Sequence, residues 1–191
     1  MTAPSGRARR SRADFERNRS EIVTQAERHF AESGVGASLE AVARDAGVGS
    51  ATLYRHFPTR DALLAEVLQR RTDTLEASKA RIEQLDDPDA ALEAWLAALE
   101  EYFGAFDGLS GPLRSALAQE HNPLTLTCIG FIHGTDHFLR AAQQHGSARQ
   151  DVRGRDLFLA VLATSWVRGA SLADDEAAGR LRGLMRDGYR R

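Results

Sequence analysis

The chain has 191 residues, and its 25 basic and 27 acidic side chains give a formal net charge of −2. With 42% hydrophobic and 27% charged residues, the composition excludes a disordered or fibrous chain, and the length suits one or two folded domains. No apolar run approaches the roughly 20 residues of a membrane helix, and none follows the charged N-terminus as in a signal peptide. We therefore expect a cytoplasmic protein without membrane contact, and its one cysteine, Cys128, excludes an internal disulfide framework.

Leu and Ala together occur 53 times in the sequence, whereas Val and Ile together occur 12 times. Because helices favour Leu and Ala and strands favour β-branched residues, this ratio predicts an all-α fold. The charge is uneven, since residues 1–60 hold 10 arginines and 7 acidic residues while residues 61–191 hold 15 basic and 20 acidic residues. A basic end on an acidic body indicates a nucleic-acid-binding module joined to a second domain.

The first predicted domain follows a short basic segment. Residues 1–13 have no apolar period, and we expect them to form a flexible basic arm. A helical period then begins at Phe15, and two short helices, each preceded by a capping serine, are expected at 39–46 and 51–57. These three helices form a predicted domain of residues 14–59.

The second predicted domain, residues 60–191, contains six further helices. They are separated by glycine-rich breaks or opened by Asp-Pro and Asn-Pro pairs, which place proline at the first helical position. Their approximate ranges are 60–85, 88–106, 113–119, 123–144, 157–170 and 174–189. The sequence therefore predicts nine helices, three in a small domain and six in a larger bundle, without an internal repeat.

Residues 38–57 show the pattern of a helix, a three-residue turn and a short second helix. Ala43 keeps the crossing point of the two helices small, and Gly47 suits a turn residue with positive φ. The second helix leaves small, hydroxylated, aromatic and cationic side chains for its outer face, and such groups suit the major groove of DNA. This pattern predicts a DNA-binding helix-turn-helix, with a plain packing corner between two helices as the alternative.

Residues 52–57, Thr-Leu-Tyr-Arg-His-Phe, are followed by Pro-Thr-Arg-Asp-Ala-Leu-Leu. Together they resemble the DNA-binding signature of the TetR family of one-component bacterial repressors. The resemblance covers about residues 22–67 and rests on many matched positions. It implies a three-helix DNA-binding domain and a six-helix domain for ligand binding and dimerisation, the same division that the helix pattern indicates independently.

The resemblance also implies which side chains contact DNA. The base-facing positions at the start of the recognition helix are Ser50, Ala51 and Thr52. The positions that match or suit phosphate contacts are Ser38, Tyr54, His56 and Arg60. Two further cations expected on exposed faces beside these contacts are Arg44 and Arg55.

An effector and a second subunit are further implications of the resemblance. An apolar inducer would lie inside the larger domain. The candidate lining residues are Trp95, Phe103, Phe106, Cys128, Phe131, His133 and Trp166. The candidate dimer residues on the last two helices are Leu157, Val161, Trp166, Leu181, Leu184 and Met185. The alternative for both sets is an ordinary bundle core, with His133 exposed.

Metal binding and catalysis have weaker support. His133 and His137 share a helix face at a spacing that suits zinc, but Cys128 lies about 140° around the helix and does not complete the ligand set. No nucleophile elbow, Walker loop or dinucleotide-binding fingerprint is present in the sequence. We therefore predict no enzyme activity, no cofactor and no metal.

Taken together, these patterns predict a homodimeric repressor that binds an inverted-repeat operator in double-stranded DNA. A small, largely apolar ligand would release it by favouring a state that does not bind DNA. A constitutive regulator without a ligand and a metal-responsive sensor are the alternatives, and the choice between repressor and activator stays open.

Overall fold

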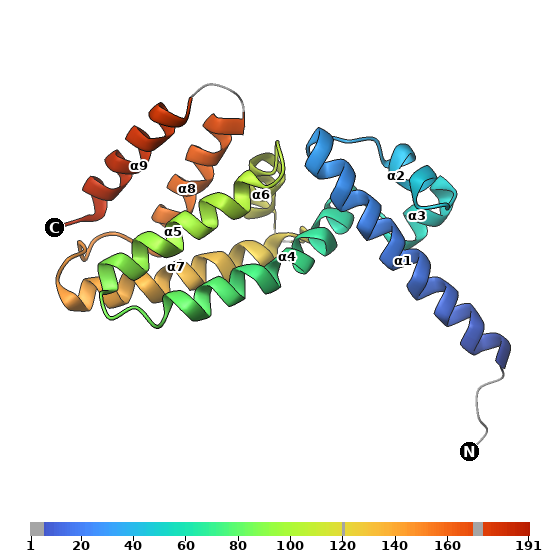
Figure 1. The fold of residues 1–191 in the computed structure, drawn as a ribbon, viewed down its shortest axis with the longest axis horizontal. Helices are drawn as coiled ribbons and strands as arrows, with labels where there is room; N and C mark the ends of the chain where they lie inside the picture. The colour runs from blue at the N-terminus through green and yellow to red at the C-terminus, as the bar shows by residue number, and fades with distance from the viewer. Residues whose placement is uncertain (1–5, 120, 170–173) are drawn as a thin grey trace, which may run out of the picture.

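The computed structural model describes residues 6–119, 121–169 and 174–191. Within these residues the chain forms nine α-helices and no β-strand, which confirms the predicted all-α fold. The helices are α1 (Gly6–Ser33), α2 (Leu39–Asp45), α3 (Ser50–His56), α4 (Arg60–Ile82), α5 (Pro88–Gly104), α6 (Ser110–Ala118), α7 (Thr125–His145), α8 (Gly154–Gly169) and α9 (Asp175–Tyr189). Figure 1 shows two lobes, one built from α1 to α3 and the other from α5 to α9, joined by α4.

The small lobe contains the predicted helix-turn-helix, packed against α1. Val42 of α2 and Leu53 of α3 are fully buried, and Ala43 is 1% exposed at the crossing. Gly47 has a φ of +67° in the turn between the two helices, where any other residue would be strained. The turn chemistry expected from the sequence is therefore present, and both helices end within one residue of the prediction.

α1 is longer than the sequence suggested. It begins at Gly6, so residues 6–13 are helical and the prediction of a flexible arm is wrong for them, while residues 1–5 lie outside the described part of the chain. The C-terminal half of α1 is anchored in the core, where Ile22 and Phe30 are fully buried. Its N-terminal turns run beyond α2 and α3 (Figure 1). α1 thus has a packed half and a projecting half.

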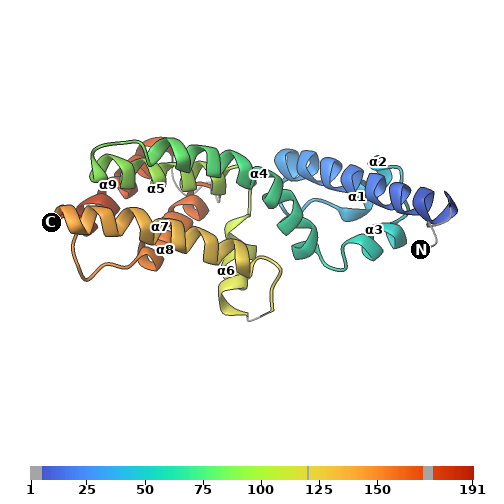
Figure 2. The same ribbon diagram turned by 90° about the horizontal axis from the view of Figure 1, so that it is seen from below.

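α4 belongs to both lobes. It packs against α1 at one end and against α5 further along, and Figure 2 shows it running from the small lobe into the larger one. The Thr59 hydroxyl caps its start by accepting a hydrogen bond from Ala62 N at 3.0 Å. Buried leucines continue along it from Leu64 to Leu75. One continuous helix therefore relates the positions of the two lobes.

Aromatic rings fill the centre of the larger lobe, between α5, α7 and α8. The Phe103 ring packs edge to face against Phe131 and Phe158, with centroid distances of 5.5 and 5.7 Å. Gly134 allows the Trp95 ring to approach α7, because a Cβ at this position would lie 2.6 Å from it. This core consists of rings in direct contact.

The C-terminal end of α9 is fastened to the loop between α7 and α8. Arg149 N donates to the carbonyl of Tyr189 at 2.9 Å, and Arg191 N donates to the carbonyl of Ser147 at 2.9 Å. The Tyr189 side chain is buried there, and burial raises the pKa of its hydroxyl to about 12. These contacts anchor the C-terminal end of α9 to this loop, while α9 itself packs against α8.

Candidate nucleic-acid interface and ligand cavity

α3 turns one face to solvent and the opposite face to the core. Its outward residues are Ser50, Ala51, Tyr54 and Arg55. Thr52 is half-buried, and its hydroxyl accepts a hydrogen bond from Arg55 Nη2 at 2.8 Å. Gly49 occupies the N-cap position, so Ser50 is the first helical residue rather than the predicted cap. The exposed face carries the hydroxylated, aromatic and cationic groups expected for DNA contact.

Ser38 and Arg44 lie at the two ends of α2, both exposed. The Ser38 hydroxyl accepts from Ala41 N at 3.3 Å, as an N-cap, and donates to the Glu40 carboxylate at 2.8 Å. The backbone N–H of Glu40 and this hydroxyl hold the pKa of the Glu40 carboxyl below its usual value. Arg44 Nε lies 3.5 Å from Asp45 at the surface. Both side chains are accessible to a DNA backbone.

His56 differs from the prediction of an outward phosphate contact. Its side chain is buried against α1, with the ring centroid 4.1 Å from that of Phe15. Burial, reinforced by the nearby charges of Arg19 and Arg55, lowers the pKa of the imidazole. The structure therefore makes His56 a packing residue between α1 and α3.

Arg60 is also turned inward, although we expected a phosphate contact. Its Nη1 donates to the carbonyl of Val35 at 2.8 Å and to that of Ala37 at 2.7 Å. The side chain is half-buried at the start of α4. Arg60 thus joins α4 to the turn between α1 and α2 and does not extend toward solvent.

Arg19 on α1 completes this side of the small lobe through contacts with distant parts of the chain. Its guanidinium lies over the Phe57 ring, 4.5 Å from the centroid, and its Nη2 is 2.9 Å from the Glu66 carboxylate. Its partners lie on α4 and just after α3, far away in sequence, so no local pattern could identify it. Arg19 stabilises the packing behind the recognition helix.

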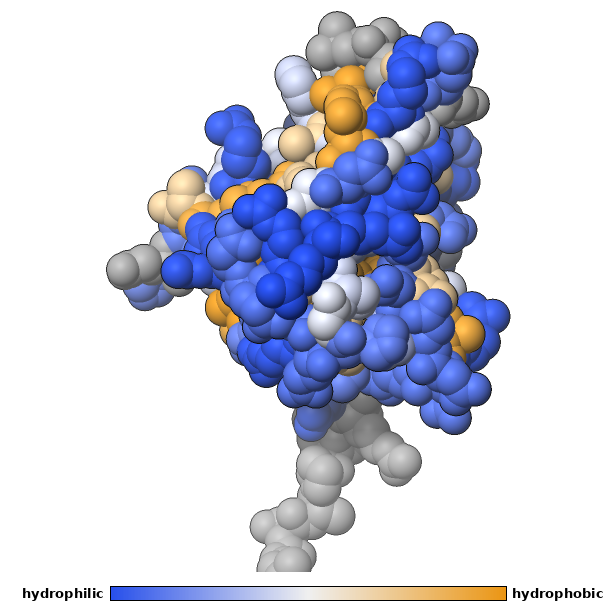
Figure 3. All heavy atoms as spheres, turned by 90° about the vertical axis from the view of Figure 1, so that its left-hand side faces the viewer, coloured by the Kyte–Doolittle hydropathy of each residue, from blue (hydrophilic) through white to orange (hydrophobic). Residues whose placement is uncertain are grey.

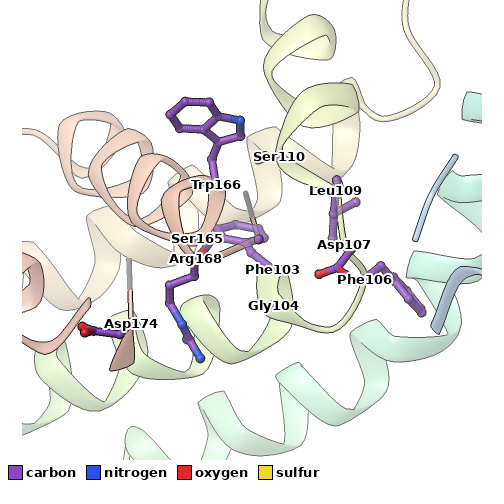
Figure 4. Close-up of a pocket in the computed structure, with 12 residues that line it drawn as sticks. Phe103, Gly104, Phe106, Asp107, Leu109, Ser110, Ser165, Trp166, Arg168 and Asp174 are labelled. Atoms are coloured by element: carbon purple, nitrogen blue, oxygen red, sulfur yellow. The ribbon is translucent and has the colours of Figure 1, made fainter. Parts of the chain in front are cut away.

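A cavity of about 570 Å³ lies at the margin of the larger lobe, between the end of α5, the start of α6 and the last turn of α8. Figure 4 shows its lining. Of the predicted ligand residues, three line it: Phe103, Phe106 and Trp166. Three other lining residues that we did not predict are Asp107, Ser165 and Arg168.

The remaining predicted ligand residues lie elsewhere. Trp95 Nε1 donates to the Thr135 hydroxyl at 3.0 Å inside the core, and Phe131 belongs to the aromatic cluster. Cys128 is fully buried against the Leu113 carbonyl, and burial raises the pKa of its thiol to about 11. His133 is exposed to solvent, which agrees with the alternative given from the sequence and not with a place in the ligand site.

A buried carboxylate connects three helices beside this cavity. Glu100 on α5 accepts from Arg168 Nη1 of α8 at 3.3 Å and from Arg182 Nη1 of α9 at 3.1 Å, and its side chain is 5% exposed. Nothing in the local sequence indicated this pairing, since the residues are 68 and 82 positions apart. The cluster fixes the last turn of α8 against α5.

The candidate dimer residues divide into two groups. Leu157 and Val161 are 4% and 2% exposed in the monomer's own core, so they are not available to a second subunit. Trp166 and Leu184 are 53% and 70% exposed. Leu181 and Met185 are half-buried on α9. Figure 3, which views the molecule from the end where α9 lies, shows a hydrophobic strip flanked by hydrophilic side chains.

Leu159, which we did not predict, adds to the outer face of α8. It is 39% exposed and shares a helix face with Ala163 and Trp166, also exposed. An apolar groove of about 420 Å³ runs along this face beside α6. The outward apolar surface of α8 therefore lies on the side opposite Leu157 and Val161.

The described part of the chain contains no group of three or more His, Cys, Asp or Glu side chains that could hold a metal ion. The His137 Nε2 atom instead lies 3.4 Å from the Oε1 atom of Glu83. Within the same residues, no helix is long and apolar enough to cross a membrane.

Two family models match the chain. One, described as "Bacterial regulatory proteins, tetR family", matches residues 22–67. The other, described as "Transcriptional regulator SbtR-like, C-terminal domain", matches residues 87–191. An HTH-type transcriptional regulator of Staphylococcus aureus (strain USA300) is 40% identical over 63 residues, which is 32% of this chain and 34% of that protein. The matched stretch thus spans about a third of that curated relative.

Solved structures cover more of the chain. The TetR transcriptional regulator SCO0520 from Streptomyces coelicolor is 33% identical, covers 90% of this chain and 98% of its own, and has a TM-score of 0.58. The regulator FadR from Bacillus subtilis, in complex with stearoyl-CoA, is 18% identical over 88% of this chain and 98% of its own, with a TM-score of 0.63. RolR, in complex with resorcinol, is 20% identical over 93% of this chain and 89% of its own, also with a TM-score of 0.63.

Proposed function

Because the chain belongs to the TetR family of bacterial transcriptional regulators, which bind DNA, we propose that it is a homodimeric repressor of an inverted-repeat operator. The observation that carries this proposal is the outward face of α3. Tyr54 and Arg55 are exposed there while Leu53 on the opposite face is fully buried, so the helix is held rigidly with its polar face outward. Such a helix fits the major groove. The protein would act in the bacterial cytoplasm.

Dimerisation would use the outer faces of α8 and α9. Leu159, Trp166 and Leu184 are large apolar side chains, each more than a third exposed in the monomer. Their burial against a second copy would remove apolar surface from water, which favours association. A two-fold dimer presents two recognition helices, and this explains why an inverted repeat is the expected operator.

Control by a small molecule is supported by the cavity at the end of α5. Its volume of about 570 Å³ is in the range of ligand sites, and aromatic side chains form part of its wall. FadR and RolR, which share the fold, are described with stearoyl-CoA and resorcinol bound. A constitutive regulator without a ligand is the alternative.

Phe106 provides a route from this cavity to the DNA-binding lobe. It lines the cavity, and its ring packs edge to face against Phe30 of α1 at a centroid distance of 6.3 Å. The Arg71 guanidinium of α4 lies 5.2 Å from the same ring. In Figure 4 the Phe106 ring points away from α8, toward α1 and α4. A ligand that displaces the α5–α6 turn would therefore move both helices that support the recognition helix, and would shift the population away from DNA binding.

The proposal is tested by selecting bound sequences from random double-stranded DNA and footprinting the best of them. We expect a two-fold symmetric site, a dimer in sedimentation at micromolar concentration, and lower reporter transcription when the site overlaps a promoter. A monomeric protein or a site without symmetry would contradict the dimeric mechanism. Higher transcription in the same reporter would indicate an activator.

A further inference from the structure

We propose that the cavity between α5, α6 and α8 binds an aromatic organic cation, a ligand with a protonated amine or quaternary centre on a ring-containing body. This inference specifies the ligand class of the proposed effector site and rests on that proposal. It depends on the charges, the rings and one hydroxyl group that line the cavity.

The charge of the lining is negative. Among the described residues that line it, the ionisable side chains are Asp107, Arg168 and Asp174, which sum to −1. Arg168 is already paired with the buried Glu100, and Glu100 in turn binds Arg182. Glu100 and Arg182 have opposite charges, so including them leaves the summed charge at −1. An anionic ligand would therefore meet a surplus of negative charge, whereas a cation would reduce it.

Asp107 is the carboxylate in the lining that is available to pair with a ligand. Among the side chains that the structure describes, it has no hydrogen-bond or ion-pair partner. It lies next to the last turn of α8, since a Cβ at Gly169 would be 3.9 Å from its Oδ1. Figure 4 shows its carboxylate pointing from the α5–α6 turn toward α8. Asp174 also lines the cavity, and one of its carboxylate oxygens accepts a hydrogen bond from Ala177 N at 2.7 Å to cap α9.

The Ser165 hydroxyl is an independent indication that a ligand binds here. Ser165 is 8% exposed and lines the cavity, and its Oγ has no hydrogen-bond partner in the described part of the chain. By contrast, the Thr164 hydroxyl bonds back to the carbonyl of Ala160 at 3.0 Å. A buried polar group without a partner is costly, so its presence in a cavity wall needs an explanation. A polar substituent of the ligand would satisfy this hydroxyl.

The aromatic part of the ligand is inferred from the wall. Phe103 and Phe106 line the cavity beside the carboxylate, and the Trp166 indole, half exposed, stands at its rim. Ring faces attract both apolar bodies and organic cations, and they complement a carboxylate that neutralises the cationic centre. These groups together favour a cation with rings over a fatty acid, an acyl thioester or a neutral phenol.

The ligand class is tested with two probes of the same shape and opposite charge, tetraphenylphosphonium and tetraphenylborate. Their affinities for the full chain are measured by isothermal titration calorimetry. We expect tetraphenylphosphonium to bind more tightly. Asp107→Asn should weaken it roughly fivefold and strengthen tetraphenylborate by a similar factor, as for a partly exposed ion pair. Asp86→Asn, a matched change at an exposed loop carboxylate between α4 and α5, should alter neither affinity.

Two outcomes overturn the proposal. The first is that tetraphenylborate binds the unaltered chain at least as tightly as tetraphenylphosphonium does. This comparison needs no variant. The other is Asp107→Asn leaving both affinities unchanged. Release of the selected DNA site is measured separately with tetraphenylphosphonium. Binding that depends on Asp107 without DNA release would support the ligand class and contradict the effector role, so the two proposals fail separately.

Discussion

The backbone N–H of Val35 donates a 2.9 Å hydrogen bond to the carbonyl oxygen of Asp107. This bond joins the turn between α1 and α2, in the DNA-binding lobe, to the turn between α5 and α6, in the larger lobe. The same carbonyl excludes a side chain at the preceding residue, because a Cβ on Gly34 would lie 2.7 Å from it. The two turns therefore meet through backbone groups, which leave little room for adjustment.

Gly34→Ala should damage this contact. Gly34 has a φ of +73°, which disfavours alanine by about 1–2 kcal/mol, and the added methyl group would collide with the Asp107 carbonyl. We expect a loss of at least about 1 kcal/mol in urea unfolding and weaker coupling between ligand and DNA binding. Gly36→Ala is the control, since nothing lies within 4 Å of its Cβ position. Equal stability of the two variants would contradict the importance of this contact.

Two conservative substitutions on α3 test the placement of the recognition helix. Tyr54→Phe removes one exposed hydroxyl and should weaken DNA binding by about 1 kcal/mol on all sequences alike, as expected for a phosphate contact. Thr52→Ala should change sequence preference as well, and it also removes the acceptor that holds Arg55. Binding is measured by fluorescence anisotropy on the selected site and on single-base variants of it. If both variants bind like the parent, the contact face has been misplaced.

The helix-turn-helix could be read from the sequence because its determinants are local. Gly47 fixes the turn, Ser38 caps α2, and the four-residue spacing of Leu53 and Phe57 fixes the buried side of α3. His56 and Arg60 could not be oriented in the same way. His56 packs against Phe15, and Arg60 donates to the carbonyls of Val35 and Ala37. These contacts form only when α1 packs across α3 and α4.

The larger lobe was harder to predict because α8 is apolar on most of its surface. Without a clear polar face, periodicity could not decide whether Leu157 or Leu159 points outward, and we chose the buried one. Ser165 gave no signal at all, since a single serine in a helix usually bonds back to its own backbone. Cavity residues of this kind become apparent only when α5, α6 and α8 are brought together.

Leu184→Arg tests the dimer. Leu184 is 70% exposed, so arginine costs little in a monomer but places an unpaired charge in an apolar interface. We expect loss of dimerisation in sedimentation velocity and loss of operator binding together. Leu126→Arg is the matched control, because this leucine is 80% exposed at the start of α7, where it lines a hollow with residues of α4. A Leu184→Arg protein that remains dimeric would exclude the proposed interface.

His56 should make the DNA-binding lobe less stable in mild acid. Its pKa is lowered from 6.5 in the folded state, chiefly by burial, so the unfolded chain takes up a proton first as the pH falls. The stability is complete above pH 6.5 and decreases as the pH drops below it toward the folded pKa. We expect His56→Gln to reduce the fall in thermal midpoint between about pH 7.5 and pH 5.5. His121→Gln, at an exposed loop position, should leave it unchanged.

The projecting half of α1 is expected to add charge to the DNA interface. Deleting residues 1–12 removes four arginines and no acidic residue, whereas deleting residues 1–5 removes no charged side chain and serves as the control. Each phosphate contact contributes about 0.9 to the slope of log affinity against log salt, because bound cations release counterions. The longer deletion should therefore lower affinity at low salt and flatten the slope, while ligand binding in the larger lobe stays intact. Since Arg60 is bonded to the carbonyls of Val35 and Ala37, an unchanged slope would assign the positive charge that matters to exposed arginines outside the deleted segment, such as Arg17, Arg44 and Arg55.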